Sequence, residues 1–140
     1  MVSERDRSCE IRLRVPFCDL DPMHVVWHGN YLKYFDMARF ALFDRMGVDL
    51  YGLSRKGEYT FPVIKTSVKY IHPLRYADEF ITKATIVDAQ IKIILDFEIR
   101  LADSAKICAR GRGEQVAVSV LDMEMQLEIP EVVRTALGFS

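Results

Sequence analysis

The stretch from about Asn30 to Met46 constrains the fold most, because it reads as a helix that is apolar over most of its surface. Asn30 is a plausible N-cap, and Gly47 is a plausible stop after the last turn. At about 100° per residue, the polar side chains gather on one side of this helix: Lys33, Asp36, Arg39 and Asp44. A helix with so little polar surface must be wrapped by other structure.

Alternating apolar residues before and after this helix predict β-strands. One strand precedes the helix and four follow it: Glu10–Phe17, Phe61–Tyr70, Phe80–Val87, Ile93–Leu101 and Ala105–Leu121. Short turns at 88–90 and 102–104 join the last three strands into an antiparallel meander. In the last strand the apolar phase changes near Gly111 and Gly113, which predicts a bulge or bend there. Pro130–Leu137 is expected to form a short final helix.

One helix cannot cover both faces of a five-stranded sheet, so the sheet is expected to curl around it. The fold class is therefore α+β, with an antiparallel sheet wrapped around one long central helix. A length of 140 residues corresponds to one domain, which we expect to span residues 1–140. The uncovered outer face and sheet edges predict a homo-oligomer.

Composition and charge exclude several classes of function. The net charge of −1 gives no electrostatic attraction to nucleic acid. No run of about 18 apolar residues is present, so we expect no membrane span, and the charged N-terminus does not read as a signal peptide. Cys9, Cys18 and Cys108 have no metal-site spacing, so they are expected to be free thiols in a cytoplasmic protein, and no metal is predicted.

The densest cluster of chemical side chains lies between the first strand and the helix, at residues 19–31. Asp21 is placed to act as a nucleophile or as a base toward water, because Pro22 fixes the turn that follows it. The amides of His28 and Gly29, at the helix start, could stabilise an oxyanion, and the His28 side chain could orient water or shuttle a proton. The alternative is that these residues only cap the helix and form a turn. Asp19 is expected to be structural.

Two segments resemble a known family: VPFCDLDPMHVVWHGNYLKYFDMAR at residues 15–39 and YIHPLRYAD at residues 70–78. The first is similar to the D-x-D…N-Y…[ED]-x-A-R signature of the hot-dog-fold thioesterases, and most resembles the 4-hydroxybenzoyl-CoA thioesterase-like branch. The second matches the Y-x-x-P…D step between two strands of that family. The resemblance extends to about residue 122, and the order of elements agrees.

The resemblance implies hydrolysis of an acyl thioester, on CoA or on an acyl carrier protein, to a free acid and a thiol. It assigns the catalytic carboxylate to Asp21 and a backbone N–H toward the thioester oxygen to His28, whose side chain also assists in some members. It implies active sites at the interfaces of homodimers or homotetramers, and chemistry without a metal or another cofactor. Two departures stand out: His24 replaces a common Gly, and Asp36 replaces a common Glu. Both remain secondary catalytic candidates, although Asp36 could simply pair with Arg39.

The other candidate contacts have structural alternatives. Substrate-binding contacts are expected from residues around the helix start and at the end of a strand: Trp27, Gly29, Asn30, Tyr31 and Tyr70. Trp27 and Tyr31 could equally be core residues, and His72 reads as a loop or interface residue. Five basic residues could meet the phosphates of CoA or form a solvated strand face: Lys65, Lys69, Lys106, Arg110 and Arg112. Two other functions stay open: a non-catalytic acyl-thioester-binding protein, and an enoyl-thioester hydratase or dehydratase.

Overall fold

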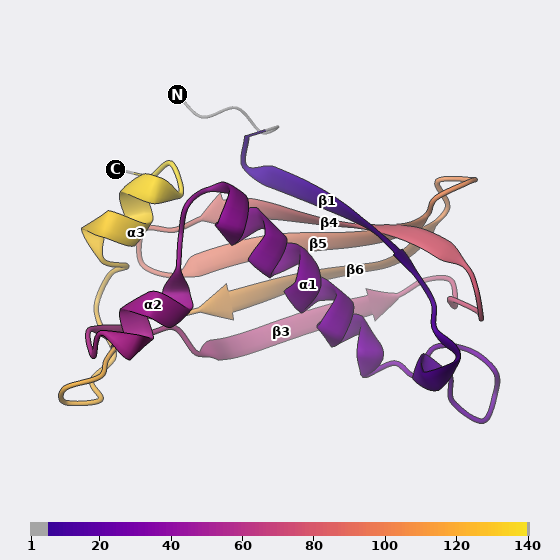
Figure 1. Cartoon of the computed structure of the whole chain (residues 1–140), viewed down its shortest axis with the longest axis horizontal. Helices are drawn as coiled ribbons and strands as arrows, with labels where there is room; N and C mark the ends of the chain where they lie inside the picture. The colour runs from indigo at the N-terminus through magenta and orange to yellow at the C-terminus, as the bar shows by residue number, and fades with distance from the viewer. Residues whose placement is uncertain (1–5, 140) are drawn as a thin grey trace.

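A five-stranded antiparallel sheet forms the body of the molecule in the computed structural model, which describes residues 6–139 (Figure 1). Its strands lie in the order β1-β4-β5-β6-β3, so the predicted meander is confirmed as β4–β5–β6. The strands are β1 (Ser8–Arg14), β3 (Val63–Tyr70), β4 (Glu79–Asp88), β5 (Ile93–Leu101) and β6 (Ile107–Gln115). β1 and β3 are the two edges.

Helix α1 (Asn30–Arg45) crosses one side of this sheet, as predicted (Figure 1). Its buried side chains pack against apolar residues of β4, β5 and β6, and together they form the core. The Phe35 and Phe97 rings stack with their centroids 4.6 Å apart, which fixes the second turn of the helix over β5. The expected α+β arrangement of one long helix against a curled antiparallel sheet is confirmed.

The sequence predicts a bulge or bend near Gly111 and Gly113, and the β5–β6 pairing has no bulge at either glycine. The β5–β6 pairing runs without interruption through both glycines, and its register shifts instead at Cys108, between the Ile99–Ala109 and Arg100–Ile107 pairs. The glycines serve a different purpose: a Cβ on Gly111 would lie 2.5 Å from the Phe35 ring and 2.8 Å from the Ser67 carbonyl oxygen. Gly111 is therefore required by the close approach of α1 to the sheet.

Among residues 6–139, only one side of α1 is covered by other parts of the chain. Leu32, Met37 and Phe40 are 43%, 44% and 56% exposed, so the expected wrapping of the helix is incomplete on this side. Arg39, predicted on the polar side, is instead buried with its guanidinium 5.5 Å from the Phe97 ring centroid. The apolar side chains on this side of α1 are therefore exposed, whereas Arg39 is covered by its own chain.

Shorter elements complete the chain. They are the 3-10 turn η1 (Phe17–Asp19), the helices α2 (Leu50–Arg55) and α3 (Glu131–Ala136), and the two-stranded pair of β2 (Tyr59–Thr60) and β7 (Val118–Ser119). The first strand thus ends before Phe17, and the long strand predicted at 105–121 is divided into β6 and β7. The predicted final helix is confirmed as α3. None of the helices within residues 6–139 is long and apolar enough to cross a membrane.

Candidate active site

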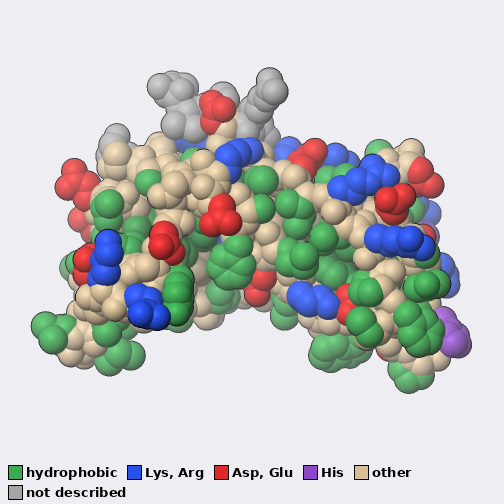
Figure 2. Space-filling model, in the orientation of Figure 1, with side chains coloured by type: hydrophobic (Ala, Val, Ile, Leu, Met, Phe, Trp, Pro, Cys, Tyr) green, Lys and Arg blue, Asp and Glu red, His purple; other side chains and the backbone are tan. Residues whose placement is uncertain are grey.

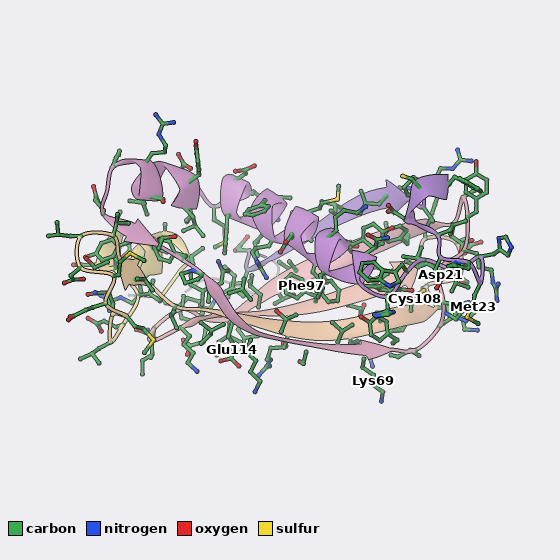
Figure 3. The ribbon with its side chains drawn as sticks, turned by 90° about the horizontal axis from the view of Figure 1, so that it is seen from below. Asp21, Met23, Lys69, Phe97, Cys108 and Glu114 are labelled. Atoms are coloured by element: carbon green, nitrogen blue, oxygen red, sulfur yellow. The ribbon has the colours of Figure 1, made fainter. Side chains whose placement is uncertain are left out.

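A pocket of about 300 Å³ lies at the end of the molecule where α1 begins. It brings together four of the predicted site residues, Asp21, His28, Tyr31 and Tyr70. Figure 3 shows Asp21 at this end of the molecule, and Glu114 toward the other end of the sheet. The loop after η1, the start of α1 and the end of β3 all contribute to the walls, so this site is built from segments far apart in sequence.

The Asp21 carboxylate is held by one of its oxygens and open at the other. Its Oδ1 accepts the Met23 N–H at 2.8 Å and the Val25 N–H at 3.4 Å, and the Asp21 N–H donates to the Val25 carbonyl at 2.8 Å. Its Oδ2 has no hydrogen-bond partner within residues 6–139. The turn therefore fixes the carboxylate while leaving one oxygen available for chemistry.

Two backbone N–H groups remain free at the start of α1. The Asn30, Tyr31 and Leu32 N–H groups bond back to the preceding turn, whereas the amides of His28 and Gly29 have no partner among the described residues. The Tyr70 hydroxyl donates to the His28 carbonyl at 2.9 Å, which fixes the peptide between His28 and Gly29. These free donors at the positive end of a 16-residue helix suit a developing oxyanion.

Trp27 lies against Gly29 and not in the pocket wall. A Cβ on Gly29 would meet the Trp27 indole at 2.2 Å, so the absence of a side chain at position 29 makes room for the ring. Trp27 is 51% exposed, and its ring lies 5.2 Å from that of His28. Of the expected substrate contacts, Trp27, Gly29 and Asn30 thus border the pocket without lining it, whereas Tyr31 and Tyr70 line it.

Asp19 anchors the loop that carries Asp21. Its side chain is buried and accepts hydrogen bonds from Lys33 Nζ at 2.7 Å and from the Tyr34 hydroxyl at 2.5 Å. Burial alone would raise the pKa of Asp19, but these two hydrogen bonds and the Lys33 charge outweigh it, so the pKa lies below its ordinary value. The expectation that Asp19 is structural agrees with this geometry.

The backbone of Asp19 positions the start of α1 as well. Its carbonyl oxygen accepts the Trp27 N–H at 2.9 Å and the Asn30 side-chain amide at 3.0 Å. The predicted N-cap role of Asn30 is therefore wrong: Gly29 is the N-cap residue, and Asn30 is the first residue of the helix. The Asn30 side-chain amide binds the preceding loop and does not cap a backbone N–H group of the helix.

Two tyrosines form an aromatic wall. The rings of Tyr31 and Tyr70 meet edge to face, with centroids 5.0 Å apart. The Tyr31 hydroxyl accepts the Leu74 N–H at 3.2 Å, and burial raises the pKa of both phenols. Both hydroxyls therefore stay protonated at neutral pH, and they hold the backbone around the pocket in place.

The two secondary candidates lie outside this pocket. The half-exposed Asp36 carboxylate pairs with the Arg39 guanidinium at 2.9 Å, as its structural alternative predicts. His24 is exposed in the turn held by Asp21 and has a positive φ of 64°. Glycine tolerates this conformation best, and histidine is among the residues that adopt it occasionally.

Sequence reasoning did not assign five lining residues to the site: Val25, Val26, Ile71, His72 and Pro73. Ile71 and His72 reach the pocket because the carbonyl of Cys108, at the β6 bulge, accepts the N–H groups of both at 2.8 and 3.0 Å. The Y-x-x-P match at residues 70–73 was the available signal. It marks the point where β3 ends beside the start of α1.

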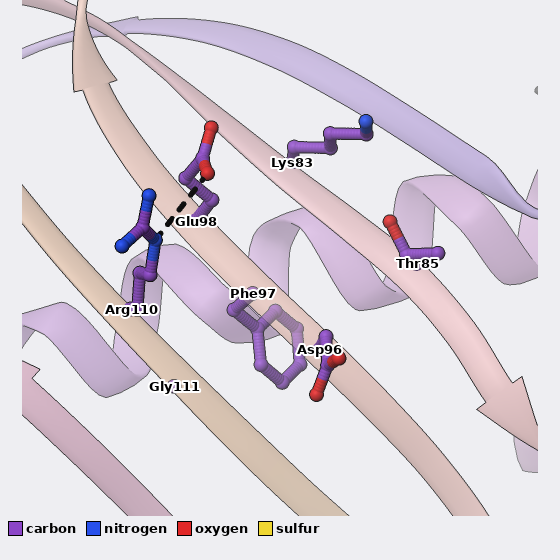
Figure 4. A pocket seen from close by; sticks show the side chains of 7 residues that line it. All are labelled: Lys83, Thr85, Asp96, Phe97, Glu98, Arg110 and Gly111. Atoms are coloured by element: carbon purple, nitrogen blue, oxygen red, sulfur yellow. Dashed lines mark ion pairs between the residues drawn. The ribbon is translucent and has the colours of Figure 1, made fainter. Parts of the chain in front are cut away.

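A second hollow, of about 320 Å³, lies on the outer face of the sheet (Figure 4). Its charged side chains already neutralise one another: Arg110 pairs with Glu98 at 3.6 Å, and the neighbouring Arg112 binds Asp96 at 2.7 Å. These ion pairs favour the interpretation that the two arginines belong to a solvated strand face and do not contact the phosphates of CoA.

An antiparallel sheet wrapped around one helix, with a carboxylate and free amides at the helix start, defines a hot-dog fold with a site suited to acyl transfer. The sequence profile of the thioesterase-like superfamily matches residues 15–137, and the chain belongs to this superfamily. A 1,4-dihydroxy-2-naphthoyl-CoA hydrolase of Synechocystis sp. is 22% identical over 125 residues, which are 89% of this chain and 90% of that protein.

Solved structures confirm the fold. A 1,4-dihydroxy-2-naphthoyl-CoA thioesterase from Synechocystis superposes with a TM-score of 0.86 at 21% identity, over 93% of this chain and 95% of that one. A 4-hydroxybenzoyl-CoA thioesterase in complex with 4-hydroxybenzoyl-CoA superposes with a TM-score of 0.81 at 16% identity, over 94% and 99%. The predicted resemblance to hot-dog thioesterases is thereby confirmed.

Proposed function

We propose that this protein hydrolyses an acyl thioester to a free acid and a thiol. The observation that carries the proposal is the Asp21 carboxylate, fixed at Oδ1 and open at Oδ2, in a pocket beside the free amides of His28 and Gly29. Membership in the thioesterase-like superfamily and the thioesterases of the same fold support it.

The chemistry proceeds at the thioester carbonyl. Asp21 Oδ2 either attacks the carbonyl carbon directly or removes a proton from an attacking water. In both routes the carbonyl oxygen gains negative charge, which the free amides at the start of α1 stabilise. The carbon–sulfur bond then breaks, and the thiolate leaves and takes up a proton. On the direct route, water hydrolyses the acyl–Asp21 anhydride and restores the carboxylate.

The substrate is an acyl group on CoA or on a carrier protein, and residues 1–140 act as one domain. Similar proteins are named for hydrolysis of CoA thioesters, which favours CoA as the carrier. A cytoplasmic location is part of the proposal. It is supported by the three cysteines, all of which are free thiols in the structure.

A homodimer or homotetramer completes the proposal. β3 is an edge strand whose two ends carry the exposed apolar residues Val63, Ile64, Tyr70 and Ile71. Helix α1 also exposes Leu32, Met37 and Phe40. Figure 2 shows apolar side chains gathered over this part of the surface, around a hollow in the outline of the molecule. Such an edge and helix face are typical of subunit contacts.

The purified protein tests this function with a panel of aliphatic and aromatic acyl-CoAs and acyl carrier proteins, and release of free thiol is the readout. We expect turnover of at least one thioester. Loss of the 2-enoyl-CoA absorbance without thiol release would instead indicate a hydratase. Binding of acyl-CoA without any reaction would indicate a non-catalytic acyl-thioester-binding protein. Either result would overturn the proposal.

A further inference from the structure

Residues 118–127 form a projecting arm with an ordered backbone. Val118 bridges to Met125, the Ser119 N–H donates to the Glu124 carbonyl at 2.9 Å, and the Gln126 N–H donates to the Ala117 carbonyl at 2.8 Å. These bonds hold the arm in one conformation. The side chains that it presents to its surroundings are therefore a fixed feature of the surface.

The arm presents apolar side chains at every second position. Leu121, Met123, Met125 and Leu127 are 91%, 69%, 64% and 89% exposed. They alternate with polar residues, among them Asp122 and Glu124. Apolar side chains cover the projection at the lower left of Figure 2, where Figure 1 shows the loop after β7. Exposed clusters of this kind mark contact surfaces.

The arm and the pocket lie at opposite ends of the same edge strand. Thr60, whose backbone pairs with Val118, precedes the start of β3 at Val63 by three positions. The pocket residues Ile71 and His72 directly follow the end of β3 at Tyr70. The length of β3 thus separates the arm from the pocket within one chain.

A second copy of this chain removes that separation. When two β3 edges pair about a two-fold axis that keeps both α1 helices on one side, the strands run antiparallel. The start of each β3 then lies beside the end of the other, so each arm comes to the partner's pocket. Charges agree with this contact, because Asp122 and Glu124 of the arm would approach the exposed bases Lys69 and Arg75 beside the pocket.

We propose that the arm of one copy closes the partner copy's pocket, and that Met123 and Met125 set which acyl groups fit. Flexible methionines suit this task, because they adapt to apolar groups of different shape. The pocket wall includes four apolar residues that suit contact with such side chains: Val25, Val26, Ile71 and Pro73. The inference rests on the proposed thioesterase function.

Mixed dimers provide the test. One copy carries Asp21→Asn, the other carries Met123→Ser with Met125→Ser, and two different affinity tags isolate the mixed dimer. In the homodimer of the arm variant we expect KM for a medium-chain or aromatic acyl-CoA to rise about tenfold, the scale of a lost apolar contact in a pocket. The single working site of the mixed dimer receives a normal arm from its partner. It should therefore show the wild-type KM at about half the wild-type kcat per dimer.

The opposite outcome is equally clear. If the arm acts within its own chain, the working site of the mixed dimer keeps the raised KM, and the proposal fails. It also fails if sedimentation shows the wild-type protein to be a monomer. Ile91→Ser, which replaces an exposed apolar residue outside the arm, is the matched control and should keep the wild-type KM. Met125→Ser alone replaces the double variant if the latter no longer dimerises.

A failure of the proposed function is distinguishable from a failure of this inference. If the wild-type protein releases no thiol from any thioester, the function fails. The arm is then tested by calorimetric binding of an acyl-CoA thioether, which cannot be hydrolysed. The double arm variant must weaken this binding about tenfold. An unchanged affinity would overturn the inference.

Discussion

Asp19 and Asp21 are two residues apart in one loop, yet their surroundings differ in every respect that matters for chemistry. Asp19 is buried, and both of its carboxylate oxygens accept hydrogen bonds, from Lys33 and Tyr34. Asp21 has one oxygen bound by backbone N–H groups and the other free in a pocket. Burial and hydrogen bonds thus make identical side chains an anchor in one case and a reactive group in the other.

The difference between the two residues follows from the hydrogen bonds that each carboxylate accepts. A carboxylate whose oxygens are bound by a lysine and a tyrosine is stabilised as the anion, and it is a poor nucleophile and base. A carboxylate fixed through a single oxygen keeps its reactivity while losing its conformational freedom. The anchor also serves the reactive group, because the Asp19 carbonyl holds Trp27 and Asn30 at the start of α1.

The largest expected effect comes from Asp21→Asn. Asparagine keeps the Oδ1 acceptor for the Met23 N–H but lacks the anionic oxygen, so kcat should fall ~10³-fold, within the range for loss of an acid–base group. The free energy of unfolding should change by less than about 0.5 kcal/mol. Steady-state thiol release and urea unfolding measure the two quantities. A fully active variant would remove Asp21 from the catalytic role.

The second-largest effect is expected from Asp19→Asn, which should lower stability more than activity. In Asp19→Asn the buried network loses its anion, and the free energy of unfolding should fall by about 2 kcal/mol, the scale for a buried hydrogen bond to a charged group. Urea unfolding measures this loss. The fall in kcat should be much smaller than in Asp21→Asn. If Asp19→Asn removed activity without loss of stability, the roles of the two residues would be exchanged.

A third, smaller effect concerns pH. The pKa of Asp19 is lowered in the folded protein, so the ionised form stabilises the fold. This contribution is fully present above the ordinary pKa near 3.8 and is lost as the pH falls through the lower folded value. Urea unfolding between pH 7 and pH 2 should show a stability difference between wild type and Asp19→Asn that shrinks below about pH 4. A difference independent of pH would contradict the assignment.

The smallest effect is expected from Asp36→Asn. Asp36 is half exposed and faces Arg39 outside the pocket, so this change should lower kcat less than about threefold, well below the scale of a lost acid–base group. The free energy of unfolding should fall by no more than about 1 kcal/mol, as for exposed ion pairs. A loss of activity as large as that of Asp21→Asn would make Asp36 the catalytic carboxylate.

Much of the fold could be predicted from the sequence because its signals are local. The Asn30–Met46 helix and the Ile93–Leu101 strand have strong periodicity, and their bounds agree with α1 and β5 within one residue. The strand over residues 105–121 was less predictable. There Gly111 makes room for the Phe35 ring, and the bulge at Cys108 depends on pairing with β5, which no local pattern encodes.

The candidate site was predictable where one segment supplies it. Asp21, His28 and Tyr31 come from a single stretch of chain, and Tyr70 came from the second motif. Val25 and Val26 are apolar loop residues without a chemical signal. His72 enters the pocket only through the hydrogen bonds of the Cys108 carbonyl, a tertiary contact. The sequence wrongly predicts Asn30 as the N-cap residue, because the acceptor of its side-chain amide, the Asp19 carbonyl, lies eleven residues away.

The contact of Gly111 with Phe35 has a mechanical consequence for the site. An α-helix bends little, and α1 packs against the sheet at Phe35, about one turn after the helix begins. A side chain at position 111 would collide with the Phe35 ring and tilt α1 relative to the sheet. The amides of His28 and Gly29 would then move relative to Asp21, although no atom of the pocket had been changed. The distance of the helix start from the sheet is thus set by the absence of a side chain at Gly111.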